Sequence, residues 1–264
     1  MSTEAENRIL LHGTDSPDID YFASIIQSYL LPHDDLFQLL FPEHFIFFKP
    51  KNHSAGDFYW LATKNQKIFI AVGDASGHGV HGALVSMAGM FFLNEIVYKD
   101  GKHNSDEILE LLREKMIQCF QKNHFNNQYQ DRIDISLCII DSEKMEAQFT
   151  GAYNSLYVIS NNNLEIYRAD HITAGQADKE NLFFTRQNFS ISHGDVIYLC
   201  TDGYSDQFGG ENRKKFMNKR FSHLLLNIYQ NSMDKQKDWL EKNLTDWMQD
   251  NAQVDDITVI GVKI

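Results

Sequence analysis

Apolar residues recur along the chain with a helical spacing in five segments. In residues 17–31 an apolar side chain stands at every third or fourth position between Pro17 and Pro32, which suit a helix start and a helix end. The segment 83–98 is apolar nearly all round, which indicates a buried helix. The other segments with this spacing are 105–121, 221–229 and 233–249. The pattern predicts an N-terminal helix followed by two pairs of helices.

Shorter apolar runs bounded by turn residues predict strands. They lie at 45–48, 56–60, 68–72, 133–141, 147–151, 155–160, 164–169, 189–191, 196–201 and 257–264. Turn-like residues at 63–66 predict that the second and third strands form an antiparallel hairpin. Many antiparallel strands with pairs of helices inserted between them are typical of an α+β fold, in which two packed sheets are flanked by helices.

We expect one large domain, because no repeat, low-complexity tract or linker divides the chain. We place that domain at 32–264 and assign 1–31 to a polar, mobile N-terminus and the amphipathic helix. The apolar face of this helix has two candidate partners. It can pack on its own domain, or it can form a homodimer with residues 17–31 of a second copy.

Composition narrows the function classes. The net charge of −12 disfavours nucleic acid and anionic membrane surfaces as partners. The apolar stretch 83–93 is too short to span a bilayer, and the N-terminus does not read as a signal peptide. The three cysteines are far apart and form no CxxC pair, which favours free thiols over a zinc site. We therefore expect a soluble, cytoplasmic protein.

Four acidic turns flank predicted strands. Asp57 precedes a strand and Asp74 follows the next one, so the hairpin makes these two residues neighbours at one sheet edge. Asp202 follows another buried strand, and Asp255 with Asp256 precedes the last. A single such turn is ordinary, because Asp is depleted within strands and also caps helices. Four of them become a carboxylate cluster if they meet at one edge.

A carboxylate cluster needs cations to offset its repulsion. An all-oxygen donor set favours Mg²⁺ or Mn²⁺ over zinc. Two such ions about 3.5–4 Å apart activate a water and clamp a phosphoryl group. The chemistry that follows from these residues is metal-assisted hydrolysis of a phosphate ester.

The chain resembles the metal-dependent protein phosphatases (PPM, protein phosphatase 2C-like), and within them the bacterial SpoIIE/RsbU-like branch. The pieces that carry the resemblance occur in the order of the family. They are Leu30-Leu31-Pro32, Ser54-Ala55-Gly56-Asp57-Phe58-Tyr59-Trp60, Gly73-Asp74-Ala75-Ser76-Gly77-His78-Gly79, Asp134-Ile135-Ser136-Leu137, Thr201-Asp202-Gly203 and Asp255-Asp256-Ile257-Thr258-Val259.

The resemblance implies an αββα sandwich with two Mn²⁺ or Mg²⁺ ions between the sheets. Asp74 would bridge the ions, and Ala75 would offer its carbonyl oxygen. Asp202 and Asp255 would complete one ion, and Asp57 would serve the other. The implied activity is a serine/threonine protein phosphatase of signal transduction that acts on a regulatory protein, typically a STAS-domain anti-anti-sigma factor.

The chain differs from the eukaryotic members of the family at two kinds of residue. Their phosphate-binding arginine is missing, and only Lys49 and Lys51 lie near its place. Their general-acid histidine has no clear counterpart: His78 and His81 are nearby but suit a solvent-facing helix start. Asp134 fits either an accessory metal ligand or a strand-end residue held by backbone amides.

Two other functions compete with a protein phosphatase. One is a catalytically silent sensor or docking module that keeps the fold. The other is a phosphoesterase that acts on small molecules. The loop 207–215 resembles the flap of the family, where it would touch substrate, but its mixed charges equally suit a solvated loop.

Overall fold

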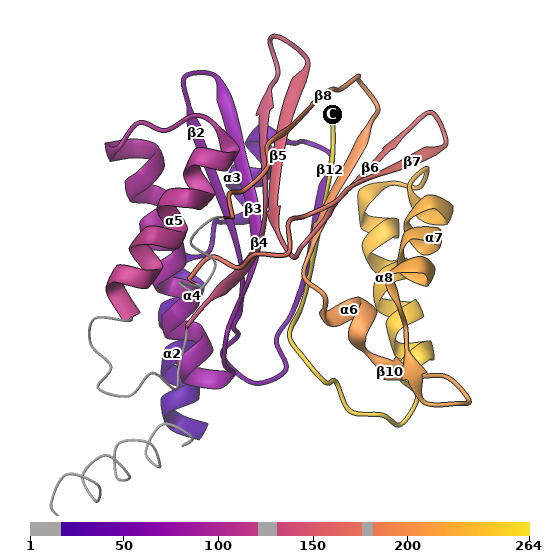
Figure 1. Cartoon of the computed structure of the whole chain (residues 1–264). Helices are drawn as coiled ribbons and strands as arrows, with labels where there is room; N and C mark the ends of the chain where they lie inside the picture. The colour runs from indigo at the N-terminus through magenta and orange to yellow at the C-terminus, as the bar shows by residue number, and fades with distance from the viewer. Residues whose placement is uncertain (1–16, 121–130, 176–181) are drawn as a thin grey trace, which may run out of the picture.

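The computed structural model describes residues 17–120, 131–175 and 182–264. The N-terminal residues 1–16, predicted to be mobile, lie outside this part. Two five-stranded antiparallel sheets face each other in the middle of the molecule, with helices on both outer sides (Figure 1). The predicted αββα sandwich is confirmed.

Sheet A has the strand order β1-β12-β9-β6-β7, and sheet B the order β2-β3-β4-β5-β8. The strands of sheet A are β1 His44–Lys49, β12 Ile257–Lys263, β9 Val196–Cys200, β6 Leu156–Ser160 and β7 Asn163–Tyr167. Those of sheet B are β2 Asp57–Lys64, β3 Lys67–Ala75, β4 Ile133–Asp141, β5 Glu146–Ala152 and β8 Gln187–Ser190. The predicted hairpin is the β2–β3 pair, and its turn is at Asn65 and Gln66, which both adopt positive φ.

Three helical segments cover the outer face of sheet B: α4 Gly79–Asn94, its π-helical continuation η1 Glu95–Lys99, and α5 Ser105–Phe120. The N-terminal helix α2, Pro17–Leu30, packs on α4. On the other side of the sandwich lie α7 Asn218–Ile228 and α8 Met233–Met248 (Figure 1). Each predicted helix is present, with bounds within a few residues of those expected.

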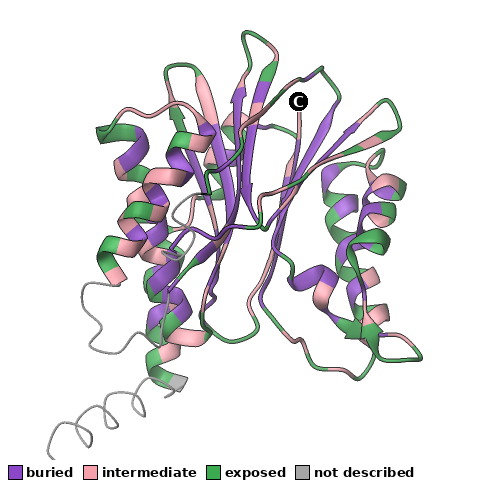
Figure 2. Ribbon diagram, in the orientation of Figure 1, coloured by how far each residue is buried: buried purple, intermediate pink, exposed green. Residues whose placement is uncertain are grey.

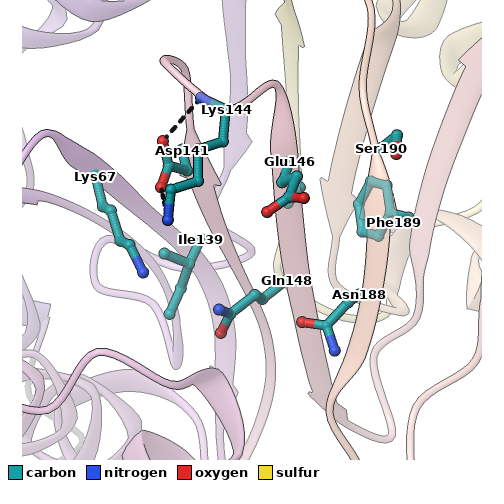
Figure 3. Close-up of a pocket in the computed structure, with 10 residues that line it drawn as sticks. Lys67, Ile139, Asp141, Lys144, Glu146, Gln148, Asn188, Phe189 and Ser190 are labelled. Carbon is teal, nitrogen blue, oxygen red and sulfur yellow. Dashed lines mark hydrogen bonds and ion pairs between the residues drawn. The ribbon is translucent and has the colours of Figure 1, made fainter.

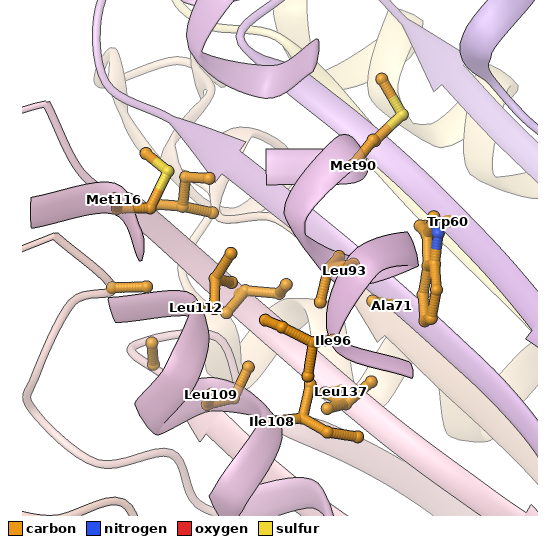
Figure 4. Close-up of a cluster of buried hydrophobic side chains, with 14 of the residues drawn as sticks. Trp60, Ala71, Met90, Leu93, Ile96, Ile108, Leu109, Leu112, Met116 and Leu137 are labelled. Atoms are coloured by element: carbon orange, nitrogen blue, oxygen red, sulfur yellow. The ribbon is translucent and has the colours of Figure 1, made fainter. Parts of the chain in front are cut away.

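Strand alternation separates the core into distinct layers. Along β4, Ile133, Ile135 and Leu137 belong to the buried cluster packed against α4 and α5. Figure 4 shows part of this cluster, with Leu137 labelled. Further along the strand, Cys138 and Ile140 face the other sheet. The inner strands are buried along most of their length (Figure 2). Asp134 and Cys138 are an even number of residues apart on β4 and so project from the same face. The side chain of Asp134 therefore points into the space between the sheets.

Helices α4 and η1 together form a continuous segment, Gly79–Lys99, that is long and apolar enough to cross a membrane. Half of its most apolar window is buried inside the domain. Val85 and Leu93 are buried against sheet B, so packing in the core accounts for the apolar composition.

The N-terminal helix α2 packs on its own domain. The Gln27 side chain is buried, and its Nε2 donates hydrogen bonds to the Ala55 carbonyl at 2.8 Å and to Ser86 Oγ at 2.9 Å. The Ala55 amide donates back to Gln27 Oε1 at 3.1 Å. Self-packing, one of the two alternatives for this helix, is therefore observed, and Gln27 connects it to the turn that precedes Asp57.

Two short elements differ from the predictions. Helix α3, Asp34–Leu40, spans only seven residues, too few to show a helical period, and buries Phe37 at the end of the sandwich. The predicted loop 207–215 contains a small hairpin, β10 Phe208–Gly209 with β11 Lys214–Lys215. Gly210 anchors it by donating to the Trp247 carbonyl at 2.9 Å.

Candidate active site

Three aspartates stand side by side across sheet B. Asp57 on β2 is the register partner of Asp74 on β3, and Asp74 is in turn the partner of Asp134 on β4. Directly opposed residues of antiparallel strands have Cβ atoms about 4.5–5.5 Å apart and project on the same face. The prediction that Asp57 and Asp74 are neighbours is confirmed, and Asp134 extends the row.

Sheet A brings its own acidic turns to this end of the sandwich. Asp202 follows β9, and Asp255 lies two residues before β12, which pairs with β9. Thr201 Oγ1 and Thr258 Oγ1 each donate a hydrogen bond of 2.7 Å to Asp57 Oδ2. These two threonines cross the gap between the sheets and hold the Asp57 carboxylate in one orientation.

The two adjacent acidic residues before β12 have different roles. Asp256 is buried, and its carboxylate accepts the backbone amides of Lys51 and Gly56, both at 2.7 Å. It thereby fixes the segment that leads into Asp57. Asp255 is exposed, and its Oδ1 accepts a hydrogen bond from the Asp256 amide at 2.9 Å. Asp255 is thus the member of the pair with a carboxylate open to the site.

Five carboxylates share one electrostatic field. Burial raises the pKa of Asp74 well above its ordinary value, and repulsion from Asp57, Asp202, Asp255 and Asp134 raises it further. Burial followed by repulsion from Asp256 likewise raises the pKa of Asp57, against the hydrogen bonds from the two threonines. The candidate residues from both sheets therefore converge at one end of the sandwich.

The pKa values of Asp134 and Asp202 are raised as well. Burial raises the pKa of Asp134 to about 7, opposed by the charge of Arg132, and Asp202 adds repulsion. Burial, followed by repulsion from Asp206, raises the pKa of Asp202 to about 6. Asp134 Oδ1 is buried and has no hydrogen-bond partner among the residues that the structure describes. A buried oxygen without a donor costs free energy unless a cation or a proton compensates it.

The donor chemistry of the site fits a hard divalent cation, because every side chain in it offers oxygen. Within the described ranges, no three His, Cys, Asp or Glu side chains are already arranged to hold a metal ion. The fit therefore lies in the donor set and in the orphaned Asp134 oxygen.

The other basic and imidazole candidates have different surroundings. Lys51 Nζ donates to the Val254 carbonyl at 2.8 Å. His78 is exposed immediately before α4, as expected for a helix start. His81 shares a 2.7 Å hydrogen bond with the buried Asp131, which raises the pKa of the imidazole. This pair lies on the helix side of sheet B, opposite the face that carries Asp134.

A surface cavity of 410 Å³ lies at the other end of sheet B (Figure 3). Its lining includes Lys67 at the start of β3, Asp141 at the end of β4 and Glu146 at the start of β5. The aspartate row occupies the opposite ends of these strands, so this cavity is separate from the candidate active site.

The raised carboxyl pKa values predict how stability depends on pH. Between the ordinary value of 3.8 and about 7, the folded protein binds more protons at Asp57, Asp74 and Asp134 than the unfolded chain. Chelator-treated protein should therefore lose stability as pH rises through this window, seen as a falling Tm from pH 4.5 to 8. Added Mg²⁺ should restore Tm most at the upper end. A Tm that rises steadily across the window would contradict this field of carboxylates.

Similar folds are found among PP2C phosphatase domains. The SiaA-PP2C domain of Pseudomonas aeruginosa is 26% identical, with a TM-score of 0.84 over 98% of both chains. The PP2C phosphatase domain and regulatory-domain fragment of SpoIIE from Bacillus subtilis is 15% identical, with a TM-score of 0.67 over 84% of this chain and 63% of that one. The RsbU and RsbW domains of Rv1364c from Mycobacterium tuberculosis are 18% identical, with a TM-score of 0.62 over 84% and 60%.

These likenesses define a PP2C-type phosphatase domain. The family model of Stage II sporulation protein E (SpoIIE) matches residues 64–264, and the chain belongs to that family. A comparison with curated protein sequences gives no match. The expected resemblance to the PPM phosphatases and their SpoIIE/RsbU-like branch is confirmed.

Proposed function

We propose that the protein is a serine/threonine protein phosphatase whose carboxylates bind two Mn²⁺ or Mg²⁺ ions. The observation that carries this proposal is the convergence of Asp74 with four further carboxylates from both sheets, all of which raise its pKa. Carboxylates packed this closely repel one another unless cations offset their charge. Membership of the SpoIIE family supports the phosphatase assignment.

We assign the metal ligands as the resemblance to the PPM family implies. Asp74 would serve both ions, and Ala75 would offer its carbonyl oxygen. Asp202 and Asp255 would complete one ion, and Asp57 would serve the other. When bound, such ions activate a water and clamp a phosphoryl group for in-line attack. Asp134, with its orphaned oxygen, is a candidate for a further ion.

The chain's own residues prepare this site before any substrate arrives. Thr201 and Thr258 occupy Asp57 Oδ2 and leave its other oxygen for a cation. Asp256 fixes the turn before Asp57 through two backbone amides. Because these contacts are already formed, little reorganisation is required when the ions bind.

Within this proposal the substrate is a phosphoserine or phosphothreonine protein in the cytoplasm, and a STAS-domain regulator is the specific candidate. Support comes from the resemblance to the regulatory branch of the family and from the fold shared with an RsbU domain. Hydrolysis rates on a phosphoserine protein and on a nucleotide, measured side by side with Mn²⁺, test the assignment. A faster rate on the phosphoprotein supports it, and a preference for the nucleotide indicates a small-molecule phosphoesterase.

We also propose a homodimer through residues 17–31. Although α2 packs on its own domain, it leaves Phe22, Ile26 and Tyr29 exposed at 64%, 57% and 85%, at helical spacing along one face. A contiguous apolar stripe of this kind is unusual on a monomer. Sedimentation velocity should show a dimer that Ile26→Asp weakens and Ser28→Asp, on another side of the same helix, does not. A wild-type monomer would refute the dimer.

A further inference from the structure

We propose that the guanidinium of Arg132 binds the phosphoryl group of the substrate. This inference rests on the proposed phosphatase function and assigns a residue to a task that Lys51 does not perform. Lys51, one of the two lysines nearest the expected place of a phosphate-binding cation, directs its Nζ to the Val254 carbonyl. Lys51 is therefore engaged with the backbone instead.

The position of Arg132 follows from the strand register. Beyond the Asp74–Asp134 pair, the β3–β4 pairing continues through Ala75 and Ile133. The next step is also formed, because the Ser76 amide donates to the Arg132 carbonyl at 2.9 Å and the Arg132 amide donates to Ser76 Oγ at 3.1 Å. The Arg132 backbone is thus held as an extension of β4.

Strand alternation then decides where the side chain points. Residues two apart on a strand project from the same face, so Arg132 lies on the face of Asp134. Its neighbours Asp131 and Ile133 are buried toward the helices, whereas Arg132 is exposed. The guanidinium consequently stands one step outside the aspartate row, at the open end of the sandwich.

The electrostatics agree with this placement. The charge of Arg132 lowers the pKa of Asp134, against the larger effect of burial. No ion pair or hydrogen bond of the guanidinium occurs among the described residues, whereas Lys215, the cation that acts on Asp202, is paired with Asp206 at 2.6 Å. Arg132 is accordingly a cation at the rim of the site.

The chemistry of the guanidinium suits the task. Its planar fork can donate two parallel hydrogen bonds to phosphate oxygens, which a lysine ammonium cannot do with the same geometry. A dianionic phosphoryl group approaching a chain of net charge −12 also needs a positive group at the entrance. Arg132 supplies both the charge and the orientation.

Calorimetric titration of the Mg²⁺-loaded protein with inorganic phosphate tests this inference. Arg132→Ala should weaken phosphate binding roughly 10- to 100-fold, the range of one or two charge-assisted hydrogen bonds. Arg132→Lys should recover part of the loss because it restores the charge without the fork. Lys144→Ala removes one positive charge at the distant cavity of Figure 3 and should leave phosphate binding unchanged.

The outcomes separate this inference from the proposed function. Phosphate binding by Arg132→Ala within twofold of wild type, or no phosphate binding by wild type, overturns the role of Arg132. If, in that case, the wild-type protein still hydrolyses a phosphoserine protein with Mg²⁺, the phosphatase assignment stands without a role for Arg132. Binding that depends on Arg132 in a protein without hydrolysis would support the anion site and count against the phosphatase.

Discussion

Replacement of Asp74 by Asn should reduce metal-dependent phosphate release by about 10²–10³-fold, comparable to the loss of one key electrostatic group in other enzymes. Asp74 is the central member of the row, flanked by Asp57 and Asp134 on neighbouring strands. The amide keeps the shape of the carboxylate but removes the negative charge, so cation binding is weakened while packing is preserved. The measurement is phosphate release from a phosphoserine protein at saturating Mn²⁺.

The same substitution should not unfold the protein. Burial, followed by repulsion from the other carboxylates, raises the pKa of Asp74, so its neutralisation removes an unfavourable buried charge in the metal-free state, and Tm should stay equal or rise. Asp141→Asn is the matched control, because Asp141 ends the neighbouring strand β4 opposite Lys67, far from the row, and should retain activity. Unchanged turnover in Asp74→Asn would contradict the metal assignment.

Gly203→Ala should be strongly destabilising. A Cβ at Gly203 would lie 1.9 Å from the Asp256 carbonyl oxygen, which belongs to the backbone and cannot rotate away. The turn that carries Asp202 and the turn that carries Asp255 would be pushed apart. We expect a loss of about 3 kcal/mol, at the upper end for overpacking. This corresponds to a fall in Tm of roughly 6–12 °C by thermal denaturation.

Gly194→Ala is the control for this prediction. Gly194 has a φ of +93° but no atom within 4 Å of an added Cβ, so only the backbone conformation opposes the substitution. That cost is about 1–2 kcal/mol. Gly203→Ala should therefore be the less stable of the two variants and should also lose phosphate release. Equal stability would show that the two acidic turns are less tightly packed than the structure indicates.

The half of the site on sheet B could be predicted because it depends on local pairing. Asn65 and Gln66 form a tight turn, and a tight turn fixes the register of the hairpin, so Asp57 and Asp74 had to be neighbours. Asp134 joined the row only through the β3–β4 pairing. That pairing connects segments separated by about sixty residues of helix and loop, and no local pattern indicates its register.

The half on sheet A could not be derived from local patterns. Asp255 and Asp256 are chemically identical in the sequence, and only the packing of the segment before β2 makes Asp256 the buried partner of the Gly56 amide. Thr201 and Thr258 lie inside the acidic motifs, yet their role as donors to Asp57 appears only when the two sheets are stacked. The cross-sheet contacts decide which members of each motif face the site.

His81 illustrates a further limit of sequence reasoning. Its position seven residues after Asp74 leaves the direction of its side chain open. The structure pairs it with Asp131 on the helix side of sheet B, while the aspartate row occupies the other face. Asp131, just before β4, and Asp134 on that strand lie on opposite faces of sheet B, and this becomes known only once β4 is placed in the sheet.

The central claim is that these carboxylates work through divalent cations. Phosphate release from a phosphoserine protein, titrated with Mn²⁺ and with Mg²⁺ from a metal-free start, tests it most directly. We predict no release without metal, saturable release with at least one of the two ions, and loss of activity on addition of a chelator. Release that persists in the chelator, or no release with either ion, would contradict the claim.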